Sequence, residues 1–231
     1  MKKILLGILS GLLMVPAVSA DVQAGSFEIG VYGGVGESFD SDVKYTDSGT
    51  SFTHKDVEWD GDSFGPAPYW GARVTYWPSS LPNWGFMLDY THAKMTAEKS
   101  SGSSPVGNIG ANYDHLEFTD GLNLVTANVL YEYDQFGRFR PYVGAGVGLA
   151  IPHVEVDRGA DSTREYQVTG IAAQVLVGGK YDLNDNFSLF GEYKLSYADI
   201  EADLENGGTL ETEGITNHFL VGISYRFGGT K

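Results

Sequence analysis

Histidines and carboxylates are the side chains of this sequence best suited to acid–base chemistry or metal binding. His115, Glu117 and Asp120 stand close together along the chain, and His153 and Glu155 form a second group. Imidazoles and carboxylates act as general acids and bases, and together they bind divalent metal ions. We therefore predict Glu117, Asp120 and His153 as catalytic candidates, and His115, His153 and Glu155 as candidate metal ligands.

The fold must bring these side chains together, because no spacing among them matches a known metal-binding motif. In the strand topology described below, all the histidines fall at one end of the molecule or in its loops; they are His54, His92, His115, His153 and His218. The alternative interpretation is that they are ordinary polar residues of loops and strand ends. The pattern leaves both interpretations open, and a divalent metal is the only cofactor that it suggests.

A second group of charged residues stands at alternate positions within apolar segments. It comprises the acids Glu28, Asp89, Glu132 and Glu192 and the bases Arg73, Lys180, Lys194 and Arg226. Alternation places these charges on the strand face opposite their apolar neighbours. Buried charges must be paired, and equal numbers of acids and bases permit a neutral network. We predict a network that fills and closes a barrel lumen; a gated ion pore is the alternative.

The elements that position these residues are strands in which apolar and small side chains alternate. The clearest is residues 139–156, where Val143 and Leu149 point one way and the glycines between them point the other. Alternation over about ten residues is typical of a strand that crosses a bilayer within a closed barrel. The glycine face leaves space in the lumen for opposing side chains such as Phe190 or Arg226.

The same pattern recurs along the chain. The predicted strands cover residues 26–37, 69–77, 84–93, 122–133, 139–156, 167–181, 187–198 and 216–227. The connections alternate between short and long, and aromatic residues gather at the short-turn end: Trp77, Trp84, Tyr131, Tyr133, Tyr181, Phe187, Tyr225 and Phe227. These features predict an all-β fold, an eight-stranded antiparallel transmembrane outer-membrane β-barrel with short periplasmic turns and long acidic extracellular loops.

Composition and the N-terminal segment agree with an exported protein. Residues 1–20 have a basic start, an apolar middle and the small residues Val18-Ser19-Ala20, which predict a signal peptide for Sec-type export, cleaved after Ala20. Residues 21–231 would then form one barrel domain. The chain has no cysteine, which excludes disulfides and thiol chemistry. Its formal net charge of −15 argues against nucleic acid as a partner.

The closing segment GISYRF, with Tyr225 and Phe227, together with the strand pattern, resembles the small eight-stranded outer-membrane barrels of the OmpA-like and opacity-porin-like superfamily. The resemblance covers the whole mature chain and implies a Gram-negative outer-membrane location. It also implies that Tyr225 and Phe227 form a signal for the barrel assembly machinery, although four residues follow Phe227. We expect a monomer in contact with the lipid bilayer.

Several segments also resemble the rhizobial lipid A oxidase family. They are Ser63-Phe64, PYWGARVTYW (68–77), WGFMLDYTHAK (84–94), LEFTDGLN (116–123), PYVGAGVGLAIPHVEV (141–156) and FGEYK (190–194). This resemblance implies oxidation of the proximal glucosamine of lipid A to 2-aminogluconate. It implies no catalytic residues, because none is assigned for that family.

Two functions therefore remain open, and a diffusion porin is a distant third. The first is an outer-leaflet enzyme that acts on lipid A, and the second is a non-catalytic surface barrel that supports the envelope or binds partners. The loops are strongly acidic: residues 199–213 hold six acids and no base. Since lipopolysaccharide is also anionic, contact with it would need Ca²⁺ or Mg²⁺ between the two surfaces. A solvated acidic rim is the simpler interpretation.

Overall fold

The computed structural model describes residues 25–61, 63, 65, 68–118 and 121–228. The predicted signal peptide and Asp120 lie outside these residues. The barrel strands are β1 (Ser26–Ser38), β5 (Trp70–Trp77), β6 (Trp84–Ala93), β9 (Leu122–Glu132), β10 (Phe139–Ala150), β13 (Gly170–Asp182), β14 (Phe187–Asp203) and β15 (Thr209–Phe227). Among the described residues, no helix is long and apolar enough to cross a membrane.

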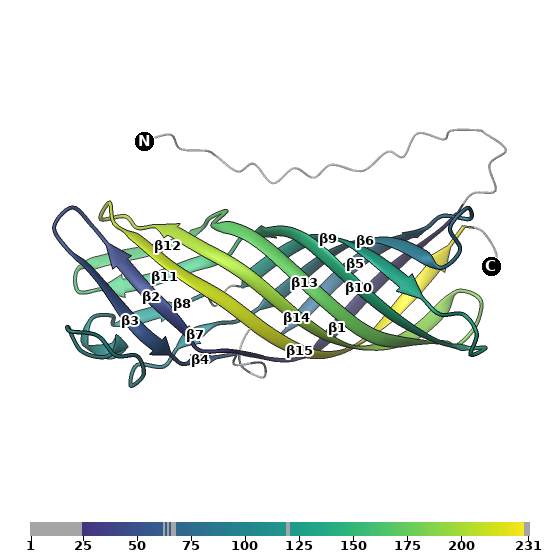
Figure 1. The fold of residues 1–231 in the computed structure, drawn as a ribbon, viewed down its shortest axis with the longest axis horizontal. Helices are drawn as coiled ribbons and strands as arrows, with labels where there is room; N and C mark the ends of the chain where they lie inside the picture. The colour runs from purple at the N-terminus through teal and green to yellow at the C-terminus, as the bar shows by residue number, and fades with distance from the viewer. Residues whose placement is uncertain (1–24, 62, 64, 66–67, 119–120, 229–231) are drawn as a thin grey trace.

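These strands form a closed antiparallel barrel. Each pairs with the next along the chain, and β15 pairs with β1 from Phe27 opposite Phe227 to Ser38 opposite Thr216 (Figure 1). Side-chain burial alternates as the sequence pattern predicts. Val147 and Val221 are 69% and 70% exposed on the outer face, whereas Tyr142 and Leu220 are buried in the lumen. An apolar outer face is what a strand in contact with lipid requires, and the predicted fold class is confirmed.

The short connections lie at one end of the barrel, where aromatic side chains form a belt. Ring pairs there include Trp84 with Tyr131, at 5.1 Å between centroids, and Phe187 with Tyr225, at 5.0 Å. Such belts lie at the membrane interface. Trp77 was predicted to belong to this belt, but it does not. It is 5% exposed and points into the lumen, because it directly follows the outward-facing Tyr76.

At the other end, the barrel wall continues beyond the predicted strand ends. β14 and β15 pair as far as Asp203 opposite Thr209, so most of the predicted last loop is a hairpin. Two further strands, β2 (Ser41–Thr46) and β3 (Ser51–Val57), extend the sheet from β15. Ile200, Ala202 and Leu210 are fully buried at alternating positions. This period-two burial explains why the hairpin continues through an acidic segment.

The long connections build a second sheet, which the sequence did not predict. Its strands, in order, are β12 (Asp161–Tyr166), β11 (His153–Arg158), β8 (His115–Glu117), β7 (Thr96–Ala97) and β4 (Trp59–Asp60). The predicted continuous strand over residues 139–156 is therefore wrong. It ends at Ala150, and after Pro152, which has no N–H to donate, the chain enters β11 in the other sheet.

The two sheets enclose an apolar core outside the membrane-spanning part of the barrel. We call this region the cap: β2 and β3, the hairpin residues 199–215, the five-stranded sheet, and the 3-10 helix η1 (Ile109–Ala111). Val43, Tyr45, Met95, Phe118 and Leu210 are fully buried there. Burial of large apolar side chains stabilises a fold, so the extracellular connections form a folded structure.

Candidate functional site

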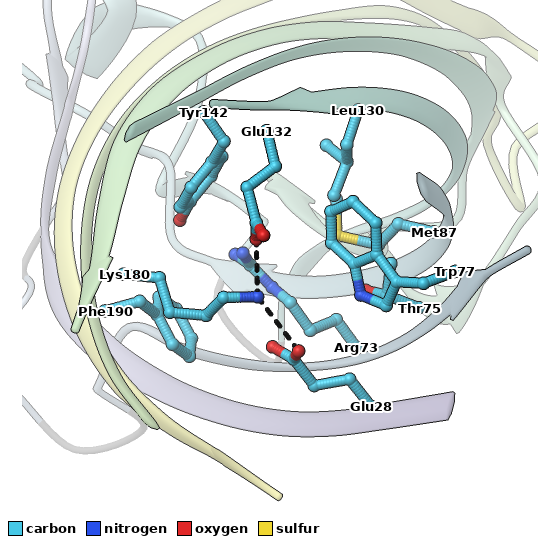
Figure 2. A pocket seen from close by; sticks show the side chains of 10 residues that line it. All are labelled: Glu28, Arg73, Thr75, Trp77, Met87, Leu130, Glu132, Tyr142, Lys180 and Phe190. Atoms are coloured by element: carbon cyan, nitrogen blue, oxygen red, sulfur yellow. Dashed lines mark hydrogen bonds and ion pairs between the residues drawn. The ribbon is translucent and has the colours of Figure 1, made fainter. Parts of the chain in front are cut away.

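The periplasmic end of the lumen contains a connected set of ion pairs. Lys180 Nζ lies 2.9 Å from Glu28 Oε2 and 2.7 Å from Glu132 Oε2 (Figure 2). Arg226 donates to Glu28 at 3.0 Å, and Arg140 lies 3.2 Å from Glu132. Alternation in β1, β9, β10, β13 and β15 turns all these side chains inward. Four of the eight predicted lumen charges therefore meet at this level.

Arg73 occupies the middle of the lumen. It forms two hydrogen bonds with Glu192, at 2.8 and 3.0 Å, and Tyr142 donates to the same carboxylate at 2.8 Å. Its guanidinium also lies 4.7 Å from the ring centre of Tyr32 and 4.6 Å from that of Phe190. Such a bidentate ion pair with aromatic contacts fixes the position of the arginine.

The upper lumen is built around Lys194 and Asp89. Lys194 Nζ donates to Asp89 Oδ2 at 2.5 Å and to Thr91 at 3.0 Å, and it lies 2.9 Å from the Tyr32 hydroxyl. Gln174 also donates to Asp89, at 3.2 Å. Both charged groups therefore have several hydrogen-bond partners, which a buried ion pair requires.

The lumen charges pair between strands, some with a neighbouring strand, as Glu28 with Arg226, and some across the lumen, as Lys194 with Asp89. The ion pairs join five acids to five bases: Glu28, Asp89, Glu132, Asp182 and Glu192 with Arg73, Arg140, Lys180, Lys194 and Arg226. The free space beside them, drawn in Figure 2, is about 20 Å³, enough for about one water molecule. The network thus fills most of the lumen at this level.

Sequence analysis missed Arg140 and Asp182. Arg140 has the inward parity of Tyr142 in β10, so strict alternation would have found it. Asp182 lies one residue beyond the predicted strand 167–181, but it is the last residue of β13 and pairs with Arg140. Tyr32, inside the predicted strand 26–37, accepts a hydrogen bond from Lys194 that the sequence did not predict.

The glycine face of β10 is filled by its neighbours. A Cβ on Gly146 would lie 2.0 Å from Asn128 Oδ1, and one on Gly144 would lie 2.4 Å from Leu130. The expected occupants, Phe190 and Arg226, are elsewhere. Phe190 lies against Gly222 instead, 2.3 Å from where its Cβ would be. The glycines therefore serve lumen packing and leave no open groove at these positions.

Four of the predicted chemical side chains meet outside the lumen, on the second sheet. His115 Nε2 lies 2.6 Å from Glu117 Oε1 and 3.9 Å from Glu155 Oε2. His153 Nδ1 lies 2.9 Å from Glu155 Oε1. β8 and β11 bring them together, because Glu117 and Glu155 are directly opposite in the ladder. The fifth candidate residue, Asp120, is outside the described residues.

The other histidines do not join this group. His54 is fully buried in the cap between Phe52 and Tyr113, with ring centres at 5.2 and 5.9 Å. His218 is buried in the lumen, stacked on Tyr69 at 4.5 Å. Neither of these histidines was among the predicted site residues, and the chain places them on inward-facing positions of β3 and β15.

His92 belongs to a third arrangement, on the outer wall just below the cap. Trp70, His92 and Asn123 are adjacent across β5, β6 and β9. The Asn123 side-chain oxygen accepts from Tyr90 at 2.6 Å and lies 3.0 Å from His92 Nδ1. Trp70 is 44% exposed, with its ring centre 5.3 Å from that of Tyr90. We call Trp70, Tyr90, His92 and Asn123 the rim patch.

The outward-facing side chains of the barrel wall change from apolar to aromatic and polar at the rim patch. Toward the membrane, the next ladder row is Ala72, Tyr90, Val125 and Leu149, and the row beyond it is Val74, Leu88, Ala127 and Val147. Apolar side chains thus give way to aromatic and hydrogen-bonding ones over two rows. This is the change expected where a barrel passes from acyl chains to lipid headgroups.

Comparisons with known proteins agree with the barrel. The outer membrane protein OprG of Pseudomonas aeruginosa matches over 90% of this chain and 98% of its own, with a TM-score of 0.53 and 14% identity. Outer membrane protein AlkL, solved in lipid bilayers, matches over 93% and 95%, with a TM-score of 0.50 and 19% identity. At such identities these likenesses show the fold alone.

Sequence comparison gives the family. Outer membrane protein PagN of Salmonella typhimurium strain LT2 is 26% identical over 130 residues, which cover 49% of this chain and 54% of PagN. The chain thus spans about half the length of this curated relative. The model of the outer membrane protein beta-barrel domain matches residues 10–227, and the location is the Gram-negative outer membrane. The chain belongs to the outer membrane protein beta-barrel domain family.

Proposed function

We propose that this protein is a closed surface barrel that binds the sugar headgroup of lipid A in the outer leaflet, along the rim patch. The observation that carries the proposal is the adjacency of Trp70, His92 and Asn123 on the outer wall, directly above apolar rows. The filled lumen favours a function at the outer surface over diffusion through the barrel.

The chemistry of the rim patch suits a sugar. An exposed indole offers an apolar face that packs against the C–H groups of a sugar ring, and hydrogen-bonding side chains beside it bind hydroxyls. Trp70 supplies the exposed indole, while His92 and Asn123, which are 8% and 6% exposed, place polar groups at its edge. The simpler alternative is an aromatic belt that anchors the barrel without binding any particular lipid.

Oxidation of the bound lipid A is a second candidate function. The pair of His153 and Glu155, 2.9 Å apart and 14% and 15% exposed, favours it. A carboxylate that orients an imidazole makes it an effective general base. Conversion of the proximal glucosamine to 2-aminogluconate would also need an electron acceptor, such as dioxygen. Glu117 and His153 remain the candidate catalytic residues in the described part of the chain.

A binding measurement tests the first proposal. Native mass spectrometry of the purified barrel, with lipid A or with phosphatidylethanolamine added to the detergent, should show preferential retention of lipid A. Trp70→Ala should weaken it about fivefold, as loss of an aromatic contact of about 1 kcal/mol would. The matched control is Trp84→Ala, which removes an equally exposed indole, at 43%, from the opposite end. Equal retention of both lipids, or an equal loss of lipid A binding in both variants, would contradict the proposal. The rim patch would then be an aromatic belt that only anchors the barrel.

The second candidate needs a separate readout. Lipid A isolated from a lipid-A-producing host with and without this gene should differ by the oxidised species in its mass spectrum. The change should disappear with His153→Gln while heat-modifiable mobility of the barrel on a gel is retained. If the wild-type gene produces no oxidised lipid A, the barrel is a binding protein without this activity.

A further inference from the structure

The five-stranded sheet of the cap places two acids directly against each other. Thr96, Glu117, Glu155 and Arg164 lie in one row across β7, β8, β11 and β12, each opposite the next. The Glu117 and Glu155 side chains are each only 15% exposed. Like charges directly opposite each other in a sheet are destabilising, and partial burial strengthens the repulsion. This position therefore favours the binding of positive charge.

An imidazole lies beside the two carboxylates. His115 is two residues from Glu117 on the same face of β8, with its Nε2 2.6 Å from Glu117 Oε1. One ligand atom from each of His115, Glu117 and Glu155 can be chosen so that all three lie within 4.8 Å of one another. Atoms bound to one Zn²⁺, each about 2 Å from the ion, lie within about 4 Å of one another. Small side-chain rotations would bring the three to that spacing.

The charge of the surrounding face matches a divalent ion. Besides Glu117 and Glu155 it carries Asp157, opposite His115, and Arg164, which pairs with Asp157 at 2.5 Å. Over β8, β11 and β12, the acids Glu117, Glu155 and Asp157 with Arg164 give this face a formal charge of −3 + 1 = −2, with the imidazoles left out of the count. The Nε of Arg164 lies 3.8 Å from Glu155, but that side chain is 53% exposed and can move away at little cost.

We propose that His115, Glu117 and Glu155 bind one divalent transition-metal ion of the Zn²⁺ type on the outer surface of the cap. An imidazole with two carboxylates is a ligand set for Zn²⁺ or Mn²⁺, whereas Ca²⁺ and Mg²⁺ take oxygen ligands. Three protein ligands leave a coordination position open to a ligand from outside. The ion would bridge β8 and β11 and replace the repulsion between the two acids by attraction. The site is independent of the proposed lipid A contact.

Calorimetric titration tests the metal site. The full chain, folded in detergent micelles without a histidine tag, is titrated with ZnCl₂ at pH 7.5. One saturable site per barrel is expected. His115→Gln and Glu117→Gln should each weaken binding at least tenfold, because each removes one of three ligands. The control Glu211→Gln, which removes an exposed cap carboxylate that pairs with Lys44, should leave the affinity unchanged.

Two further measurements make the outcome decisive. Heat-modifiable mobility establishes that each variant has folded, and Co²⁺ in place of Zn²⁺ should give visible absorption bands that His115→Gln alters. Titration without saturation, or equal affinity in wild type and His115→Gln, would overturn the proposal. His115, Glu117 and Glu155 would then only contact one another. Trp70→Ala should retain zinc affinity, so failure of the lipid A proposal and failure of the metal site are distinguishable.

Discussion

Lys194 Nζ and Asp89 Oδ2 lie 2.5 Å apart in the lumen, and neither side chain has any solvent exposure. Because removal of one partner of such a pair leaves a buried charge unpaired, we expect Lys194→Met to lower the free energy of unfolding by about 3–5 kcal/mol. The measurement is the urea midpoint of the barrel in detergent micelles. Lys194→Met with Asp89→Asn should recover part of the loss. A double variant no more stable than the single one would show that packing of the lysine chain, rather than its charge, is what matters.

Arg73→Ala should be similarly harmful, because it removes the cation from the buried Glu192 carboxylate and leaves that carboxylate the Tyr142 hydroxyl. We expect a loss of about 3–5 kcal/mol in the same urea experiment. Lys44→Ala is the matched control, because Lys44 is 46% exposed and pairs with Glu211 at 2.7 Å. Surface ion pairs contribute about 0–1 kcal/mol. Similar midpoints for both variants would contradict the structural importance of the lumen network.

The lumen pairs Lys194–Asp89 and Arg73–Glu192 show what the sequence can and cannot predict about the lumen. Alternation alone identifies Arg73, Asp89 and Lys194 as inward-facing, because parity along a strand does not depend on pairing. Alternation does not identify the ion-pair partner of each charge. Arg73 and Glu192 are 119 residues apart on strands that face each other across the barrel. Which charges meet there depends on strand stagger and tilt, which no local pattern records.

The cap was harder to predict for a different reason. Strands of two or three residues, such as β4, β7 and β8, are too short for any periodic signal. Residues 199–213 were interpreted as a loop because they are acidic, although Ile200, Ala202 and Leu210 already stand at alternating positions in the sequence. The meeting of Glu117 with Glu155 follows from the pairing of β8 with β11, which only the three-dimensional structure provides.

The cap should loosen in mild acid through His54. Burial lowers the pKa of this imidazole below its ordinary value of 6.5, and the nearby Arg158 guanidinium lowers the pKa further. Since the unfolded state then binds the proton first, the stability contributed by neutral His54 is complete above pH 6.5 and is lost as the pH falls toward the folded-state pKa. Limited proteolysis of the cap should therefore be faster at pH 5 than at pH 7.5.

The control for this prediction is His54→Phe. A phenyl ring fits the same aromatic surroundings of Phe52 and Tyr113 and cannot be protonated. The pH dependence of cap cleavage should become smaller in this variant. An unchanged dependence would assign it to the acids of the cap instead.

Phe227 closes the barrel, and its replacement should lower the amount of assembled protein. It lies opposite Phe27 where β15 meets β1, with the two ring centres 5.8 Å apart. We expect Phe227→Ser to reduce the heat-modifiable form in outer-membrane fractions. Phe136→Ser, which changes an exposed ring in a short turn, should not.

Refolding into bare lipid vesicles separates two causes of a loss in Phe227→Ser. Normal refolding of Phe227→Ser would indicate lost recognition by the barrel assembly machinery, whereas defective refolding would indicate a weakened β1–β15 seam. Full assembly in cells would contradict a role of Phe227 in closing the barrel.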